Sequence, residues 1–385
     1  MRFFISCLRL LVMPVVIAGS VCLGLAESSL AGTLKAPPAA AALTQKQSLG
    51  RKLFFDENLS TPVGQSCATC HAPEAGFANP NADYPVSQGA HKDRFGNRND
   101  LPAAYAAFSP PFHYDSEEGL YVGGQFWDGR AANLAEQAKG PFVNALEMGN
   151  PDEKTVVEKV RSSEYADLFR EVYGTAAFDD PNKAYDMIAD AIGEYEKSSE
   201  LNQFSSKYDL YLAGKVTLTQ QERRGLELFE DEDKAKCAEC HPSEPGEDGT
   251  PPLFTDFTYD NLGVPKNPEN PFYYLPKEHN PDGVHFVDLG LGGELNKPSE
   301  NGKFKVPSLR NIALTAPYFH NGIFKNLRQV VVFYNTRDVG PWAPPEVRAN
   351  VNREELGDLG LTEREVDDIV AFMLTLSDGY DPNEK

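Results

Sequence analysis

One short motif constrains this chain more than any other feature of its sequence. The pattern Cys-x-x-Cys-His occurs twice, at Cys67-Ala68-Thr69-Cys70-His71 and at Cys237-Ala238-Glu239-Cys240-His241. It is the signal for covalent attachment of haem c, in which two thiols bond to the porphyrin and the adjacent histidine ligates the iron. The alternative is zinc held by two Cys-x-x-Cys pairs, but a histidine follows each pair. The sequence predicts two covalent haems c, with His71 and His241 as axial iron ligands.

A longer repeat precedes each motif. Residues 43–54 and 218–229 both begin with Leu-Thr-Gln, continue to a glycine (Gly50 or Gly225) and end in Leu-Phe. Thr44 and Thr219 are predicted helix N-caps, and Glu222 completes a capping box in the second copy. This pattern indicates an internal duplication of one unit that contains a helix and a haem.

The rest of the chain predicts helices and long loops. The helical patterns cover residues 133–137, 152–173, 181–198, 327–334 and 362–376. Loops rich in Pro, Gly and Asn cover residues 72–99 and 244–301, and such long loops often wrap a cofactor. We expect a mainly α fold with little β structure, divided into two cytochrome c-like haem domains at residues 32–205 and 206–385.

The N-terminus has the pattern of a secretory signal peptide. A basic start is followed by an apolar run and then by small residues, so residues 1–31 are expected to be removed on export to the periplasm. The alternative is a retained membrane anchor. Cys7 and Cys22 lie in this segment, so all four cysteines of the mature chain belong to the two haem motifs.

Charge excludes some partners. The chain has 36 basic and 57 acidic residues and a formal net charge of −21. Nucleic acid and anionic membranes are therefore not expected to bind, because they require a basic surface. A basic partner protein or a neutral peroxide is compatible with this charge, although the charge can also serve solubility alone.

Several further motifs resemble those of one family, the bacterial di-haem cytochrome c peroxidases and MauG. They are Leu53-Phe54-Phe55-Asp56, Arg98-Asn99, Phe126-Trp127-Asp128-Gly129-Arg130-Ala131, Glu136-Gln137-Ala138, Gly140-Pro141, Glu147-Met148, Pro307-Ser308-Leu309-Arg310-Asn311 and Thr315-Ala316-Pro317-Tyr318-Phe319-His320-Asn321-Gly322. The resemblance covers essentially the whole mature chain. It implies that the N-terminal haem binds peroxide and that the C-terminal haem transfers electrons.

The resemblance implies roles around the first haem. Glu147 and Gln137 match the acid and amide of the peroxide pocket, where Pro141 packs over the same face. A carboxylate suits this place, because cleavage of the O–O bond requires a proton to move between the two oxygens. Trp127 matches the residue that relays electrons between the haems. In the absence of the motif, these would be ordinary helix-surface groups and a core tryptophan.

A calcium site is also implied. Asn99 and the backbone carbonyls of Thr315 and Pro317 match the calcium ligands of the family, and oxygen donors suit this ion. The alternative is that these are three ordinary loop residues.

Tyr334 distinguishes the two branches of the family. The peroxidases have a methionine ligand at the corresponding place on the second haem, whereas MauG has a tyrosine, as here. A phenolate favours ferric and higher iron, and a thioether raises the reduction potential. The alternative is that Tyr334 is a buried helix residue and that His320 or another group ligates the iron.

Two positions depart from the MauG pattern. His91 stands eight residues before Asn99, where the peroxidases have a histidine that occupies the first iron at rest; it can also be a surface loop residue. Ala235 stands two residues before Cys237, where MauG has the tryptophan that exchanges electrons with its protein substrate. A protein substrate would have to dock or conduct differently here.

These observations predict a MauG-like enzyme. It would use hydrogen peroxide to oxidise a donor, and the expected donor is an aromatic residue of a partner protein. The first alternative is a cytochrome c peroxidase that takes electrons from a small cytochrome. The second is a di-haem electron carrier without catalytic activity.

Overall fold

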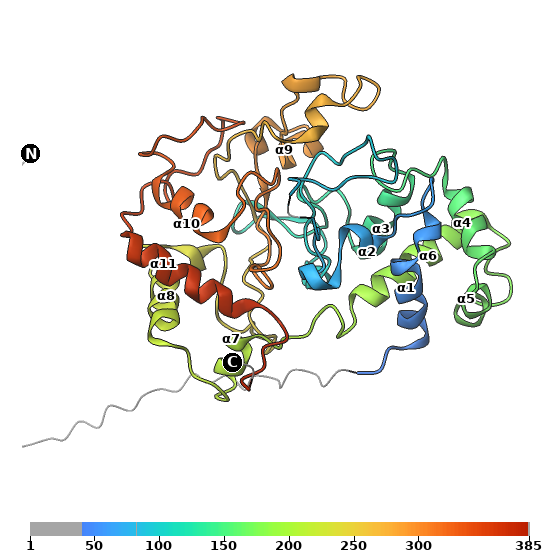
Figure 1. The fold of residues 1–385 in the computed structure, drawn as a ribbon, viewed down its shortest axis with the longest axis horizontal. Helices are drawn as coiled ribbons and strands as arrows, with labels where there is room; N and C mark the ends of the chain where they lie inside the picture. The colour runs from blue at the N-terminus through green and yellow to red at the C-terminus, as the bar shows by residue number, and fades with distance from the viewer. Residues whose placement is uncertain (1–40, 82, 384–385) are drawn as a thin grey trace, which may run out of the picture. The chain divides into compact units, whose positions relative to one another are not determined.

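Helices carry most of the regular structure in this computed structural model, which describes residues 41–81 and 83–383 (Figure 1). The predicted signal peptide, with Cys7 and Cys22, lies outside the described residues. The α-helices are α1 (Gln45–Phe55), α2 (Cys67–Cys70), α3 (Leu134–Val143), α4 (Glu153–Arg161), α5 (Ala166–Tyr173), α6 (Pro181–Glu196), α7 (Lys207–Leu212), α8 (Gln220–Glu230), α9 (Leu291–Leu295), α10 (Leu327–Thr336) and α11 (Glu363–Met373).

Strands are short and few in the described ranges. β1 (His113–Asp115) and β2 (Leu120–Val122) form an antiparallel hairpin, and β3 (Tyr259–Asp260) pairs antiparallel with β4 (Phe304–Lys305). The 3-10 turns are Glu57–Leu59, Pro73–Ala75, Ala106–Phe108, Cys237–Glu239, Pro271–Tyr274, Gly283–His285, Pro298–Glu300 and Leu374–Leu376. The prediction of a mainly helical chain with little β structure is confirmed.

The repeated segments form equivalent helix pairs. α1 packs on α6, and α8 packs on α11. A capping box opens each repeated helix, at Thr44 and at Thr219. At both crossings a glycine lets the backbones meet, because a Cβ on Gly50 or Gly225 would lie 1.9 Å from a carbonyl oxygen of the partner helix. In each copy, the two helices can cross this closely only because the residue at the crossing is a glycine.

Two separate cores accompany the two helix pairs. One contains buried side chains between Leu49 and Phe204, and the other contains buried side chains between Tyr208 and Leu376. In Figure 1 the helices of the first core lie at the right of the view and α8, α10 and α11 at the left. The division into two haem domains between residues 205 and 206 stays a prediction, because the described residues pack together as one compact unit.

Two segments differ from the expected pattern. The helix expected over residues 152–173 breaks between α4 and α5, where the Ser163 hydroxyl donates to the carbonyl of Val160. Such side-chain bonds compete with helix continuation. The expected loop over residues 244–301 contains β3, α9 and 3-10 turns, which are too short to show in sequence periodicity.

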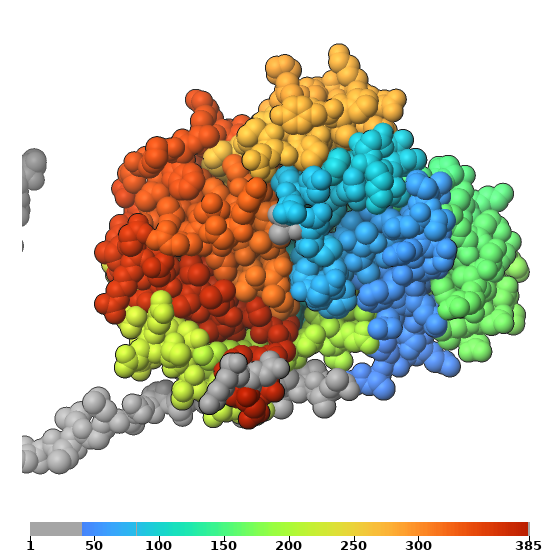
Figure 2. All heavy atoms as spheres, in the orientation of Figure 1, coloured from blue at the N-terminus to red at the C-terminus, as the bar shows by residue number. Residues whose placement is uncertain are grey.

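Part of the second long loop forms an exposed surface segment. Residues 271–289, light orange at the top of Figure 2, carry four exposed apolar side chains: Tyr274, Val284, Val287 and Leu289.

Within the described ranges, no helix has the length and apolar character needed to cross a bilayer.

Replacing Gly225 by alanine should destabilise the fold. The new methyl group would overlap the carbonyl of Asp368 on α11, so we expect the free energy of unfolding to fall by about 1–3 kcal/mol. Gly140→Ala is the matched control, because this α3 glycine has no contact closer than 3.7 Å and alanine favours helices. Denaturant unfolding of both holoproteins measures the difference. Equal stability of the two variants would contradict close packing at Gly225.

Candidate functional site

Two cavities contain the two cysteine motifs. The first cavity includes Cys67, Cys70 and His71 and has a volume of about 190 Å³. The second cavity includes Cys237, Cys240 and His241 and has a volume of about 160 Å³. Four residues line both cavities: Trp127, Lys305, Val306 and Pro307. The cavities are therefore neighbours that share a wall.

A backbone carbonyl orients the histidine of each motif. His71 donates from Nδ1 to the carbonyl of Phe77 at 3.1 Å, and His241 donates from Nδ1 to the carbonyl of Phe254 at 2.7 Å. A carbonyl only accepts, so both imidazoles carry their proton on Nδ1 and leave Nε2 free for a metal. Burial lowers the pKa of both, that of His241 to about 4, which keeps them neutral.

Both accepting phenylalanines have an unusual backbone. Phe77 has φ of 60° and Phe254 has φ of 53°, values that are rare for bulky residues. Such conformations persist where surrounding structure imposes them, and they cluster at functional sites. The same device appears in both halves. Sequence reasoning missed it because Phe77 lies six residues after its histidine and Phe254 lies thirteen residues after its own.

The cysteines fit haem c better than zinc. All four are free thiols, and each pair faces a different cavity, so they cannot bind one ion together. Burial raises the pKa of every one, that of Cys70 and Cys237 to about 12, so the thiols are protonated when nothing is bound to them. No group of three or more His, Cys, Asp and Glu side chains suited to a metal ion occurs in residues 41–81 and 83–383.

The predicted peroxide-pocket residues line the first cavity together. Gln137 and Pro141 stand one turn apart on α3, on the same helix face, and Glu147 follows that helix. Burial raises the pKa of Glu147 to about 7, the Asp100 carboxylate adds to the rise, and Arg130 opposes it. A carboxyl group that titrates near neutral pH can both accept and release a proton.

Trp127 lies between the cavities. Its ring is 8% exposed and contacts Phe304 and His320 edge-on, with centroid distances of 6.5 and 6.4 Å. Its Nε1 donates to the carbonyl of Asn99 at 2.8 Å. The other tryptophan, Trp342, packs on Phe324 and Phe333, and it does not line the first cavity or the second.

Asn99 and Pro317, two of the three predicted calcium ligands, are in contact. The Asn99 amide lies 2.6 Å from the carbonyl oxygen of Pro317, and Thr315 stands two residues earlier on the same buried loop. Asn99 and the loop that contains Thr315 and Pro317 are far apart in the sequence, and the fold brings them together.

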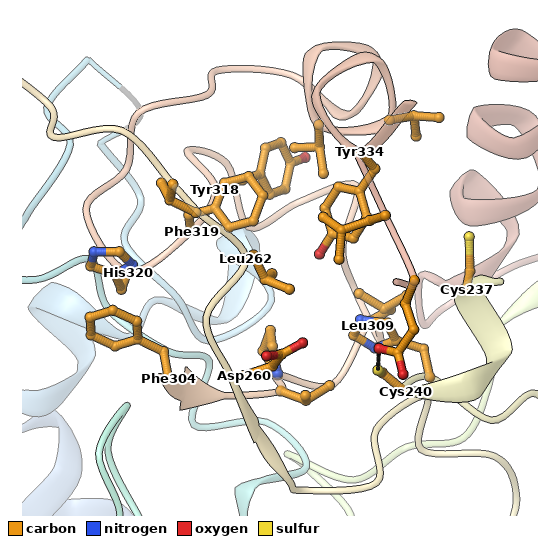
Figure 3. Close-up of a pocket in the computed structure, with 18 of the residues that line it drawn as sticks. Cys237, Cys240, Asp260, Leu262, Phe304, Leu309, Tyr318, Phe319, His320 and Tyr334 are labelled. Carbon is orange, nitrogen blue, oxygen red and sulfur yellow. Dashed lines mark hydrogen bonds between the residues drawn. The ribbon is translucent and has the colours of Figure 1, made fainter. Parts of the chain in front are cut away.

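Tyr334 points into the second cavity from α10 (Figure 3). Its hydroxyl has no hydrogen bond to any described residue, and burial raises its pKa well above the usual value. Its ring stacks on Phe319 at a centroid distance of 6.0 Å. The Tyr334 side chain is partly buried and its hydroxyl faces the open space of the cavity, where a bound cation would be a partner for it.

Two other side chains of the second cavity are possible ligands. His320 stacks on Phe304 at 3.6 Å, and its Nε2 lies 4.0 Å from a carboxylate oxygen of Glu346, on the side of the cavity away from Cys237 and Cys240 in Figure 3. Met373 also lines the cavity, from α11. Sequence reasoning passed over Met373 because it lies beyond the matching motif.

His91 lies outside the residues that line the first cavity. Its ring is instead close to Gly149, where a Cβ would meet it at 3.4 Å. Ala235 is buried and lines the second cavity, so the position two residues before Cys237 offers only a methyl group.

Several charged residues that line the first cavity received no role in the sequence analysis. Lys305 lines both cavities, donates to the carbonyl of Gly124 at 2.6 Å, and burial lowers its pKa to about 7. Asp100 accepts a hydrogen bond from Ser87, and Arg130 pairs with Asp128 at 2.8 Å. Residue type alone does not separate these from surface charges, so only the fold shows that they face the cavity.

Comparison with known proteins agrees with this arrangement. A family model described as di-haem cytochrome c peroxidase matches residues 44–217. MauG, the methylamine utilization protein of Paracoccus denitrificans, is 39% identical over 87% of this chain and 89% of its own. Cytochrome c551 peroxidase of Pseudomonas aeruginosa is 32% identical over 86% and 79%. The crystal structure of the diheme peroxidase BthA from Burkholderia thailandensis has a TM-score of 0.77 and 33% identity, covering 89% and 88%.

The fold and the two cavities define a c-type cytochrome with two haem sites. The chain belongs to the family of di-haem cytochrome c peroxidases and MauG. Members of this family are haem-dependent oxidoreductases, so two haems c are the cofactors, and hydrogen peroxide with an electron-donating partner are the reactants. The resemblance found in the sequence is confirmed.

Replacing Glu147 by glutamine should change the pH dependence of peroxide turnover. In the native enzyme we expect kcat/KM for hydrogen peroxide to rise as pH passes through about 7, because the carboxylate is the form that accepts a proton. The variant should lose this rise and about 100- to 10,000-fold in rate. Glu136→Gln, at an exposed position on α3, is the matched control and should behave as native. An unchanged profile in Glu147→Gln would assign the titration to another group.

Proposed function

We propose that this protein is a MauG-like oxidoreductase that uses hydrogen peroxide to oxidise a donor, an aromatic side chain of a partner protein. Peroxide binds in the first cavity beside Glu147 and Gln137, and Tyr334 and His241 hold the iron of the second haem. The haem irons, when bound, supply the redox chemistry that reduces peroxide. We further propose export to the periplasm through the signal peptide of residues 1–31.

The side chains of the first cavity would handle protons and position. Glu147, with a pKa of about 7, would accept a proton from the inner peroxide oxygen and return it to the outer one, which leaves as water. Gln137 would hydrogen-bond peroxide, and Pro141 would restrict access over the same face. His71 would hold the iron through Nε2, since its Nδ1 is committed to Phe77.

The observation that carries the MauG-like assignment is the position of Tyr334. It puts an unpartnered phenol into the same cavity as His241, Cys237 and Cys240. If Tyr334 holds the iron of the second haem, its oxygen would lower the reduction potential of that haem and favour the oxidised states. Trp127, in the wall between the cavities, would carry electrons from one haem to the other.

A calcium ion is proposed at Asn99, Thr315 and Pro317. The Asn99 side-chain amide nitrogen donates to the Pro317 carbonyl at 2.6 Å, which brings the two segments together. Calcium would replace that hydrogen bond and take oxygen donors from both segments. The ion would fix the loop whose carbonyl at Asn99 accepts the hydrogen bond from Trp127. We also propose that residues 32–205 and 206–385 are the two haem domains, in keeping with the two cores.

The second candidate function is that of a cytochrome c peroxidase, in which a small cytochrome supplies the electrons. Relatives named as cytochrome c551 peroxidases reach 33% identity over most of the chain. Met373, which lines the second cavity, is the side chain that would favour it. A carrier in which both irons are fully ligated is the third candidate. It would need a side chain on the first iron, and His91 lies outside the residues that line the first cavity.

Replacing Tyr334 by methionine should raise the reduction potential of the second haem. Thioether ligation favours ferrous iron, so the expected rise is on the order of 100 mV, within the roughly 0.8 V that axial ligands span. Spectroelectrochemical titration of the two haems measures it. Met373→Leu and His320→Gln are the controls and should leave that potential near the native value. A large shift in either control, with none in Tyr334→Met, would transfer the ligand role to that residue.

Hydrogen peroxide should react with the fully oxidised protein without prior reduction. A second haem with a tyrosine ligand resists reduction, so turnover cannot depend on a half-reduced form. Stopped-flow optical spectra of the diferric protein should change at once on mixing with peroxide, and EPR of the resting protein should show one high-spin and one low-spin haem. A reaction that requires one equivalent of reductant would favour the cytochrome c peroxidase, and two low-spin signals would favour the carrier.

A further inference from the structure

A row of aromatic rings connects the protein surface with the wall between the cavities. Its outer end is the β1–β2 hairpin, where Tyr114 is 50% exposed and its ring lies 4.9 Å from that of Tyr121. Tyr121 stacks on Phe112 at 5.4 Å, with the ring planes 3° apart. Phe112 meets Tyr259 edge-on at 6.0 Å. Each ring contacts the next one without a gap.

The inner end of this row is attached to Trp127. Tyr259 pairs with Lys305 in the β3–β4 ladder, and the backbone N–H of Lys305 donates to the carbonyl of Trp127 at 2.8 Å. The hydroxyl of Tyr259 donates to the carbonyl of Gly123 at 2.5 Å. The residue after Tyr259, Asp260, already lines the second cavity. Tyr259 is therefore one strand away from Trp127 and one residue away from the second cavity.

Two glycines, which have no side chain, make room for the rings of Phe112 and Tyr259 beside the Trp127 segment. A Cβ on Gly129 would lie 2.4 Å from the Tyr259 hydroxyl oxygen and 2.6 Å from the Phe112 ring. A Cβ on Gly124 would lie 3.0 Å from the Cβ of Phe112. Both glycines have positive φ, 72° and 73°. The backbone on both sides of Trp127 thus leaves room for the rings of Phe112 and Tyr259.

We propose that Tyr114 is the site at which electrons enter this protein, and that they pass through Tyr121, Phe112 and Tyr259 to Trp127. The inference rests on the proposed function, because it takes peroxide as the oxidant and Trp127 as the relay. It deepens that function by placing the donor at the β1–β2 hairpin rather than beside Cys237, where Ala235 offers only a methyl group.

The step balances without a further reactant. Each tyrosine that is oxidised loses one electron to the interior and one proton, which Tyr114 can release directly to water because its ring is half exposed. Two oxidised tyrosines from two molecules can join through a carbon–carbon bond to give dityrosine. In total two electrons and two protons leave the tyrosines, and one hydrogen peroxide takes them up and becomes two waters.

Lys297 supports oxidation with loss of the proton. Its ammonium group lies 5.0 Å from the centroid of the Tyr121 ring and 5.6 Å from that of Tyr114, and it donates to the Tyr121 hydroxyl at 3.4 Å. A nearby cation disfavours positive charge on either ring. Oxidation at this hairpin is therefore expected to yield neutral tyrosyl side chains.

The test is to treat the diferric holoenzyme with hydrogen peroxide in the absence of any donor and to map oxidised tyrosines and dityrosine by peptide mass spectrometry. Tyr114 and Tyr121 should be modified several-fold more than Tyr274. Tyr274 is the matched comparison because it is more exposed, at 66%, and its hydroxyl bonds only to the carbonyl of Pro268. If solvent exposure alone decided which tyrosine is oxidised, Tyr274 would be modified more than Tyr114.

Three variants sharpen the result. Tyr114→Phe should abolish dityrosine, and Tyr121→Phe should reduce modification of Tyr114 several-fold although Tyr114 stays exposed. Tyr274→Phe should change neither. Modification that follows exposure, with Tyr274 modified at least as much as Tyr114, overturns the path. Peroxide consumption is measured in the same samples: consumption with the wrong pattern overturns the path alone, and no consumption in any variant overturns the proposed function and the path together.

Discussion

The hydrogen bond from a buried histidine to a strained backbone carbonyl organises both halves of this protein. His71 and His241 each donate from Nδ1, and the accepting residues, Phe77 and Phe254, have left-handed backbones. The bond fixes the tautomer and aims Nε2 at a cavity before any metal binds. The direction of Nε2 sets where an iron would lie. The thiols and the residues across each cavity can act on that iron only because they surround the same point.

The two cavities share the histidine and its hydrogen bond to a backbone carbonyl, but the residues across the cavity from the histidine differ. In the first cavity, α3 and the segment after it bring polar groups, and burial leaves Glu147 able to titrate near neutral pH. In the second, α10 and the preceding loop bring aromatic and aliphatic groups around Tyr334. The two halves thus share the geometry around the histidine, whereas the opposite walls differ: Glu147 lines the first cavity and Tyr334 lines the second.

Contacts between the halves keep Trp127 in the shared wall. Arg98 pairs with Asp128, which follows Trp127, at 2.6 Å, and with Asp288 from the second half at 2.7 Å. Breaking one member of such a buried group leaves an unpaired charge, which is strongly destabilising. This network and the Trp127 bond to Asn99 hold the indole at the position where electrons would have to cross. The proposed tyrosine path reaches the same position through the β3–β4 ladder.

The sequence by itself determined the haem motifs, the helical class, the duplicated capped helices and the family, because each depends on residue type at short spacing. It also named Glu147, Gln137 and Trp127, since these lie within motifs. Only the tertiary structure decided which groups share a cavity. Met373, Lys305 and the row of rings from Tyr114 to Tyr259 carry no local signal, because contacts between distant segments are made by packing, which spacing along the chain does not encode.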